Sequence, residues 1–121
     1  MDLKTVTVLG AGTMGHGIAQ VSAMAGLDVR LYDIQESFVD AGLTKLCANL
    51  DKGVARGKVD AELAEASKGR VSGTADLKTA CVDSDLVIEA VPEKLELKQQ
   101  LFAQAESFAP YAIYATNTSS L

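Results

Sequence analysis

The feature that most constrains this chain is a glycine-rich turn set between a strand pattern and a helical pattern. Residues 5–9 are β-branched or apolar throughout and predict a buried strand. The sequence Gly10-Ala11-Gly12-Thr13-Met14-Gly15 follows directly, and beyond it apolar residues recur at helical spacing until Gly26, which predicts the end of the helix. The helical positions are Met14, Ile18, Val21 and Ala25. This order of elements predicts the first part of a parallel βαβ unit.

A turn of this kind is suited to the pyrophosphate of a dinucleotide. A pyrophosphate needs bare backbone N–H groups and the positive end of a helix dipole. Gly10 permits the tight turn out of the strand, Gly12 leaves room for the phosphates, and Gly15 lets the helix pack close to the sheet. The predicted cofactor-binding residues of the turn are Gly10, Ala11, Gly12, Thr13, Met14 and Gly15.

An acidic residue at the end of the next strand completes the dinucleotide pattern. Residues 29–32 predict a second strand, and Asp33 comes directly after it. This places Asp33 about 20 residues beyond the glycine turn, the usual spacing of the acidic residue in dinucleotide-binding units. A carboxylate there can accept both hydroxyls of the adenine ribose and would repel a 2′-phosphate, so the sequence favours NAD over NADP. Arg30 is expected within the strand, which makes it a poor ligand for a 2′-phosphate.

The rest of the chain alternates strand and helix patterns, which predicts an α/β fold with a Rossmann-type, doubly wound and mainly parallel sheet. Two helical patterns within residues 34–69 predict a helical hairpin inserted after the second strand. Further strands are expected at 70–72, 85–91 and 112–116, with one or two helical turns at 76–81 and a helix at 94–108.

Composition and charge exclude several classes of protein. The 121 residues suffice for one domain, and no apolar run approaches the roughly 18 residues needed to span a bilayer. The net charge of −5 argues against nucleic acid or an anionic membrane as a partner. Cys47 and Cys81 lack metal and redox spacing, so we expect small core residues in a reducing cytoplasm and no metal site. His16 is expected to be a packing residue rather than a general base.

Four segments of the chain together carry a family resemblance. They are the glycine turn continued to Gln20, the hairpin at 34–69, the sequence EAVPEKLELK at 89–98, and ATNTSSL at 115–121. In these segments the chain resembles the NAD-binding domain of the L-3-hydroxyacyl-CoA dehydrogenases, most closely the bacterial 3-hydroxybutyryl-CoA dehydrogenases. The resemblance covers essentially all of the chain. It implies an enzyme that interconverts (3S)-3-hydroxyacyl-CoA and 3-oxoacyl-CoA by hydride transfer to NAD.

The resemblance also implies roles for residues outside the glycine turn. Glu93 and Lys98 would lie near the nicotinamide half of NAD. Ser119 and Asn117 would be catalytic residues: Ser119 would hydrogen-bond the 3-oxygen of the substrate and contact the cofactor, and Asn117 would line the same crevice. The hairpin residues expected to contact the CoA moiety are Asn49 and Arg56.

The family pattern continues beyond the residues present here. In the family, a catalytic His-Glu pair and a helical dimerisation domain follow the NTSS segment. We therefore expect residues 1–121 to be the cofactor domain of a longer, cytoplasmic, homodimeric enzyme. Alone it should be nearly inactive, because lost general acid–base assistance costs about 10²–10⁴ in rate. Two alternatives stay open: a gulonate-type dehydrogenase of the same superfamily, and a non-catalytic NAD-binding module whose gene ends near Leu121.

Overall fold

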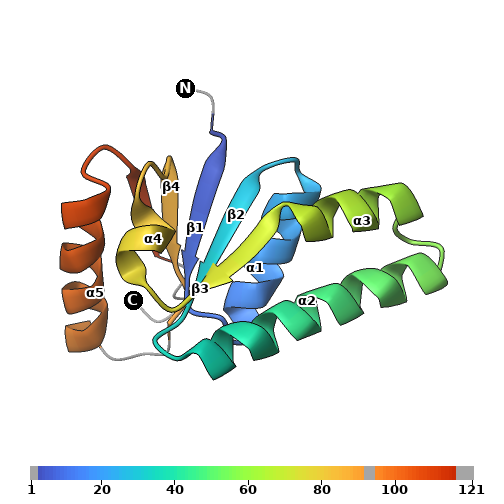
Figure 1. Ribbon diagram of the computed structural model, residues 1–121, viewed down its shortest axis with the longest axis horizontal. Coiled ribbons are helices and arrows are strands. Elements are labelled where there is room, and N and C mark those ends of the chain that lie inside the picture. Colours follow the sequence, from blue (N-terminus) through green and yellow to red (C-terminus); the bar gives the residue numbers. More distant parts are fainter. Residues whose placement is uncertain (1–2, 92–94, 117–121) are drawn as a thin grey trace.

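The computed structural model describes residues 3–91 and 95–116, in which five strands form a single parallel sheet between helices (Figure 1). The strands are β1 (Thr5–Leu9), β2 (Asp28–Tyr32), β3 (Val71–Thr74), β4 (Leu86–Glu89) and β5 (Ile113–Thr116). The helices are α1 (Thr13–Met24), α2 (Glu36–Ala55), α3 (Ala61–Gly69), α4 (Leu77–Cys81) and α5 (Leu95–Phe108). The predicted alternation of strands and helices is confirmed.

The strand order β3-β2-β1-β4-β5 places β1 at the centre of the sheet. All neighbouring strands are parallel, so their carboxyl ends lie at one edge. Strands β2 and β3 follow one another on one side of β1, and β4 and β5 follow one another on the other side. The direction therefore reverses between β1 and β4, and in such sheets the crevice beyond the strand ends at this switch point binds ligands.

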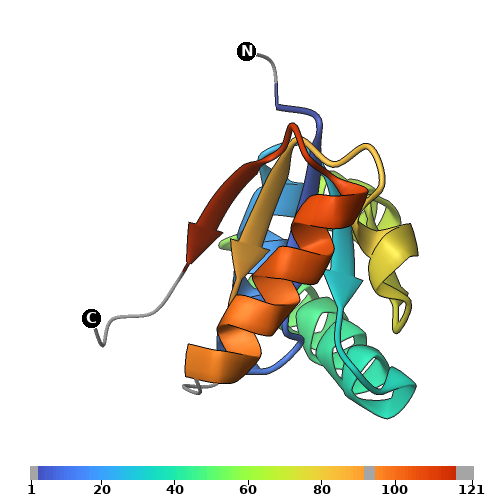
Figure 2. The same cartoon turned by 90° about the vertical axis from the view of Figure 1, so that its left-hand side faces the viewer.

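Two clusters of buried side chains fill the two faces of the sheet. One cluster joins Val6 and Leu31 of the central strands to Leu46 and Leu50 of α2. The other joins residues of β1, β4, α4 and α5, and Figure 2 shows α5 in front of β4 and beside β5. The buried members of the second cluster are Leu9, Ala80, Cys81, Val87, Ala105 and Ala109. Both faces of the sheet are thus covered, as the predicted Rossmann-type fold requires.

Helix α1 approaches the sheet through its small residues rather than its larger apolar ones. Its buried residues are Gly15, His16, Ala19 and Ala23. By contrast, Met14 and Val21, which share the periodic face seen in the sequence, are 53% and 68% exposed. The periodicity predicts the helix correctly, and Ile18 of the predicted face does pack against the core, partly buried. Residue size decides where the helix comes closest, because Gly15, Ala19 and Ala23 allow a close helix–strand approach.

The predicted element boundaries shift by small amounts. Helix α2 runs through Gly53 without a break. Asp60 stands at the N-cap of α3, although its side chain makes no capping hydrogen bond. Gly26 follows the end of α1 with a φ of +94°, a conformation that glycine adopts readily. In the described part of the chain, no helix has the length and apolarity to span a bilayer.

The two cysteines differ in exposure, which leads to a first prediction. Cys81 is fully buried and burial raises the pKa of its thiol to about 11, whereas Cys47 is only half-buried. At pH 8 roughly one Cys81 in a thousand is the reactive thiolate. We expect iodoacetamide to alkylate Cys47 well before Cys81 in the native chain, as peptide mass spectrometry would measure. Equal native rates would contradict the burial of Cys81, and equal rates in denaturant provide the control.

Candidate functional site

The glycine turn lies directly against the ends of two strands. The Gly10 N–H donates to the carbonyl oxygen of Tyr32, at the end of β2, over 2.7 Å. Gly10 has a φ of +112°, and a Cβ there would lie 2.9 Å from the carbonyl oxygen of Ala90, just after β4. A side chain at Gly10 would thus be strained and would collide with backbone. The turn is held at the switch point of the sheet.

The start of α1 presents backbone donors to open space. Gly12 is the N-cap residue, no described side chain caps the helix, and a Cβ on Gly12 would meet nothing within 4 Å. The His16 N–H donates to the Gly12 carbonyl oxygen over 3.0 Å. The preceding N–H groups, of residues 13–15, have no acceptor within a helix. Together with the helix dipole they form an open cradle for an anion.

Asp33 is fixed beside this cradle by backbone hydrogen bonds. Its Oδ2 accepts the N–H of Ala11 over 2.8 Å, and its Oδ1 accepts the N–H of Ile34 over 2.7 Å. The side chain is half-buried. Each carboxylate oxygen can accept more than one hydrogen bond, so these contacts orient the group and leave it able to accept hydroxyls.

Two other polar residues of this region have structural contacts. His16 is 7% exposed, and its Nδ1 lies 2.8 Å from the Gly12 carbonyl oxygen, so it braces the first helical turn as a packing residue. The Arg30 guanidinium donates to the carbonyl oxygens of Ala80, over 3.3 Å, and Val82, at the end of α4. These contacts occupy Arg30 on the α4 side of β2, in keeping with its predicted unsuitability as a 2′-phosphate ligand.

A buried ionic network occupies the carboxyl ends of β4 and β5. Glu89, the last residue of β4, is 1% exposed, and its Oε2 accepts the N–H of Val91 over 2.6 Å. Its Oε1 accepts the hydroxyl of Thr116 over 2.6 Å and lies 3.5 Å from the Nζ of Lys98. The family resemblance implied a role for Lys98 but none for Glu89. The sequence did hold a signal for Glu89, because it is a charged residue at the end of an otherwise apolar strand.

The predicted site residues are thus brought together in part. The glycine turn and Asp33 meet at one side of the switch point, and Lys98, which is 7% exposed, lies at the other side with Glu89. The remaining predictions at this edge of the sheet lie outside the described residues. They concern Glu93, Asn117 and Ser119.

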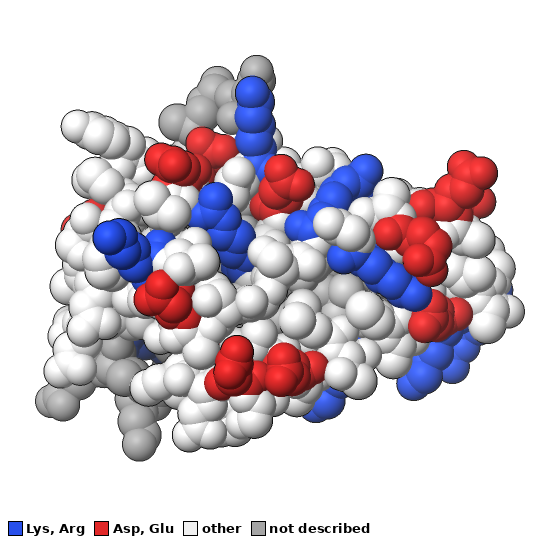
Figure 3. All heavy atoms as spheres, viewed as in Figure 1, with Lys and Arg blue, Asp and Glu red and all other residues white. Residues whose placement is uncertain are grey.

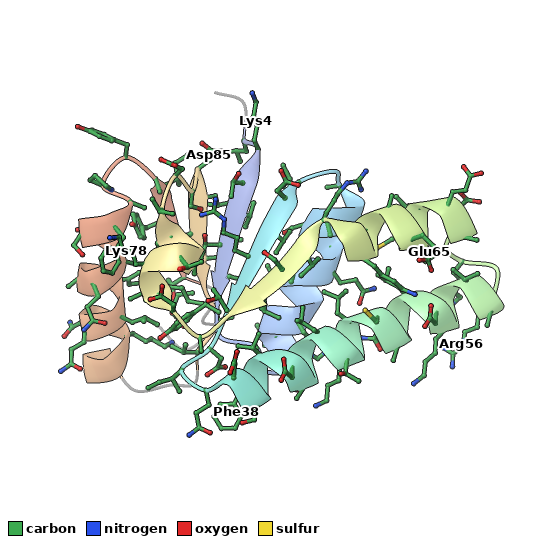
Figure 4. All side chains as sticks on the ribbon, viewed as in Figure 1. Lys4, Phe38, Arg56, Glu65, Lys78 and Asp85 are labelled. Carbon is green, nitrogen blue, oxygen red and sulfur yellow. The ribbon has the colours of Figure 1, made fainter. Side chains whose placement is uncertain are left out.

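The two residues expected to contact CoA lie on the hairpin. Asn49 and Arg56 are exposed and belong to α2 and its C-cap. Figure 4 places Arg56 near the tip of the hairpin, pointing away from the sheet. The hairpin therefore offers an exposed cation, but the structure does not bring it to the cradle.

One ion pair links the two helices of the hairpin, and a second lies within α3. The Nζ of Lys68 in α3 lies 2.6 Å from Asp51 in α2 and 3.1 Å from Glu65. Hydrogen bonds to Asp51 and Glu65 raise the pKa of Lys68. Acidic and basic side chains are interspersed over α2 and α3 on the face shown in Figure 3, so this face presents mixed charge.

A shallow, mostly apolar groove runs along the outward face of α1. It begins at the first helical turn, beside the anion cradle, and continues past Val21. Its lining residues are Thr13, Met14, Gly17, Ile18, Val21 and Ser22. The exposed apolar residues of α1 therefore form a continuous surface.

Comparisons with known proteins agree with this geometry. Residues 5–121 match a family described as "3-hydroxyacyl-CoA dehydrogenase, NAD binding domain". The chain is 43% identical to the 3-hydroxyadipyl-CoA dehydrogenase of Escherichia coli, across 100% of this chain and 26% of that protein. It is 38% identical to the 3-hydroxybutyryl-CoA dehydrogenase of Mycobacterium tuberculosis, across 98% and 42%.

A solved structure extends the similarity to the fold. The crystal structure of a 3-hydroxybutyryl-CoA dehydrogenase from Escherichia coli matches with a TM-score of 0.94 and 41% identity, covering 100% of this chain and 26% of that one. The chain thus spans less than half the length of these relatives. Over that span the chain belongs to the family of 3-hydroxyacyl-CoA dehydrogenase NAD-binding domains.

Proposed function

We propose that this chain is the cofactor-binding part of an NAD-dependent 3-hydroxyacyl-CoA dehydrogenase. The observation that carries the proposal is the open helix cradle at Gly12 with the Asp33 carboxylate held beside it. A pyrophosphate can approach the cradle, because Gly12 carries no side chain and the position of a Cβ there is open space. The Asp33 carboxylate suits the two ribose hydroxyls next to that pyrophosphate.

The rest of the dinucleotide has one direction in which to extend. Asp33 follows β2, so the adenosine half lies over that side of the sheet. The other half must then cross the switch point towards β4 and β5, where Lys98 lies. When bound, NAD supplies the hydride acceptor. We propose that Glu93, Lys98 and Ser119 contact its nicotinamide half and that Asn117 lines the same crevice.

We propose an acyl-CoA as the substrate, with short 3-hydroxyacyl chains such as 3-hydroxybutyryl favoured. The names of the relatives refer to 3-hydroxyadipyl-CoA and 3-hydroxybutyryl-CoA. In this proposal Asn49 and Arg56 contact the CoA moiety along the exposed hairpin, and Ser119 hydrogen-bonds the 3-oxygen of the substrate. The hydroxyl proton passes to a general base outside residues 1–121.

We further propose that residues 1–121 act as one domain of a longer enzyme. The greater length of the relatives supports this proposal. The additional chain would carry the general base and the contacts of a homodimer, and the enzyme would act in the cytoplasm.

Removing the Asp33 carboxylate tests the cofactor assignment. We expect wild-type chain to bind NADH more tightly than NADPH, and Asp33→Ala to weaken NADH binding by about 10- to 100-fold, because a hydrogen bond to a charged group is worth about 1.5–3 kcal/mol. NADPH binding should change less, since the repulsion of its 2′-phosphate also disappears. Titration of nicotinamide fluorescence measures both affinities.

The matched control is Asp28→Ala, which removes an exposed carboxylate at the opposite end of β2. This variant should keep the wild-type preference. Unchanged NADH affinity in Asp33→Ala, in a chain that circular dichroism shows to be folded, would refute the role of Asp33.

A further inference from the structure

The buried carboxylate of Glu89 calls for a physical explanation. Taking a carboxylate out of water is costly unless charged and hydrogen-bonding partners compensate, and an apolar residue in such a place is often at least as stable. Glu89 is 1% exposed, and it is surrounded by polar partners that belong to different elements. Its contacts therefore suggest a task other than stabilising the core.

The position of Glu89 connects it to the cradle. Its neighbour Ala90 donates its N–H to the Leu9 carbonyl oxygen over 2.8 Å, and the Ala90 carbonyl oxygen lies against Gly10. The N–H of Val91 is bound by the Glu89 Oε2 itself. The carboxylate thus fixes the strand end on which the glycine turn rests.

The other carboxylate oxygen reaches two further elements. Oε1 accepts the hydroxyl of Thr116, the last residue of β5, and lies 3.5 Å from the ammonium of Lys98 in α5. A lysine side chain has a flexible four-carbon stem, and ordering it costs conformational entropy. An ion pair in the interior keeps this ammonium in place before any ligand arrives.

We infer that Glu89 is a positioning residue of the cofactor site. Its carboxylate holds the Lys98 ammonium where the nicotinamide half of the dinucleotide crosses β4, and it fixes the end of β5 beside it. Glu89 does not touch the cofactor in this arrangement. Its negative charge acts on the cofactor through Lys98, whereas its hydrogen bonds to Val91 and Thr116 hold the strand ends and can be kept by a glutamine. The inference rests on the proposed function, because it requires that the dinucleotide extends over β4.

A double-mutant cycle on NADH affinity tests this inference. The variants are Glu89→Gln, Lys98→Gln and the double variant, and nicotinamide fluorescence gives the dissociation constant of each. If Glu89 acts through Lys98, each single change weakens NADH binding about 10-fold or more, and the double variant is no weaker than Lys98→Gln. If the fold-loss of NADH affinity in the double variant equals the product of the two single fold-losses, Glu89 acts independently of Lys98 and the inference is wrong.

Two features of the design separate folding from positioning. Glu89→Gln leaves a buried ammonium without this counter-charge and can lose its fold for that reason, whereas the double variant removes both charges. Comparing Lys98→Gln with the double variant therefore decides the question without Glu89→Gln: a further loss of affinity in the double variant overturns the inference. Glu106→Gln, an exposed acid on α5, controls for the change in net charge and should bind NADH normally.

The same titrations distinguish this inference from the proposed function. If the wild-type chain binds NADH but the affinity losses of the two single variants multiply in the double variant, the proposed function stands and the role of Glu89 is overturned. Folded wild-type chain that binds no NADH at millimolar concentration overturns both.

Discussion

Replacing Gly12 with valine is expected to abolish detectable NADH binding while the chain keeps its fold. Gly12 has a φ of −71° and a ψ of −162°, which other residues adopt without strain, and a Cβ there meets nothing within 4 Å. The valine side chain would fill the space through which a pyrophosphate approaches the N–H groups of α1. Losing two hydrogen bonds to a charged ligand, at about 1.5–3 kcal/mol each, weakens binding by roughly 10²–10⁴-fold.

The control for this variant is Gly69→Val. Gly69 also has open space at its Cβ position, but it ends α3 on the hairpin. We expect this variant to bind NADH as the wild type does, and circular dichroism should show both variants folded. Wild-type NADH affinity in Gly12→Val would mean that the cradle at α1 does not hold the pyrophosphate, and the proposed function would lose its main support.

The cradle could be predicted from the sequence because its signals are local. The turn, the helix and Asp33 lie within one βαβ unit, and Asp33 meets Ala11 since both follow adjacent parallel strands. The fold class follows from the same logic, because alternating strand and helix patterns admit few arrangements. Sequence reasoning therefore predicted the fold and the placement of Asp33 beside the glycine turn, and cofactor binding by these residues stays a prediction.

The ionic network was beyond sequence reasoning because its members come from separate elements. Thr116 and Glu89 are 27 positions apart, and nothing in either local pattern indicates that their side chains meet. Their contact depends on the pairing of β4 with β5 and on the placement of α5. Likewise, periodicity alone could not tell that α1 presents Met14 to solvent, since side-chain size decides that packing.

Gly15→Ala is expected to have the opposite outcome to Gly12→Val, although the two glycines are three positions apart in one turn. A Cβ on Gly15 would lie 1.6 Å from the carbonyl oxygen of Gly10 and 2.6 Å from its carbonyl carbon. Both atoms belong to the backbone of the glycine turn, so α1 would have to move away from β1. Overpacking typically costs about 1–3 kcal/mol, and a collision with backbone this close belongs above that range.

Thermal unfolding followed by circular dichroism measures this effect. We expect Gly15→Ala to lower Tm by at least about 10 °C or to prevent folding. The matched variant is Gly17→Ala in the same helix, where a Cβ meets nothing within 4 Å, and alanine should raise stability by up to about 1 kcal/mol. A wild-type Tm in Gly15→Ala would show that α1 does not need this close contact. Loss of stability at Gly15 and loss of NADH binding at Gly12 would together assign separate structural and ligand-binding roles to neighbouring glycines.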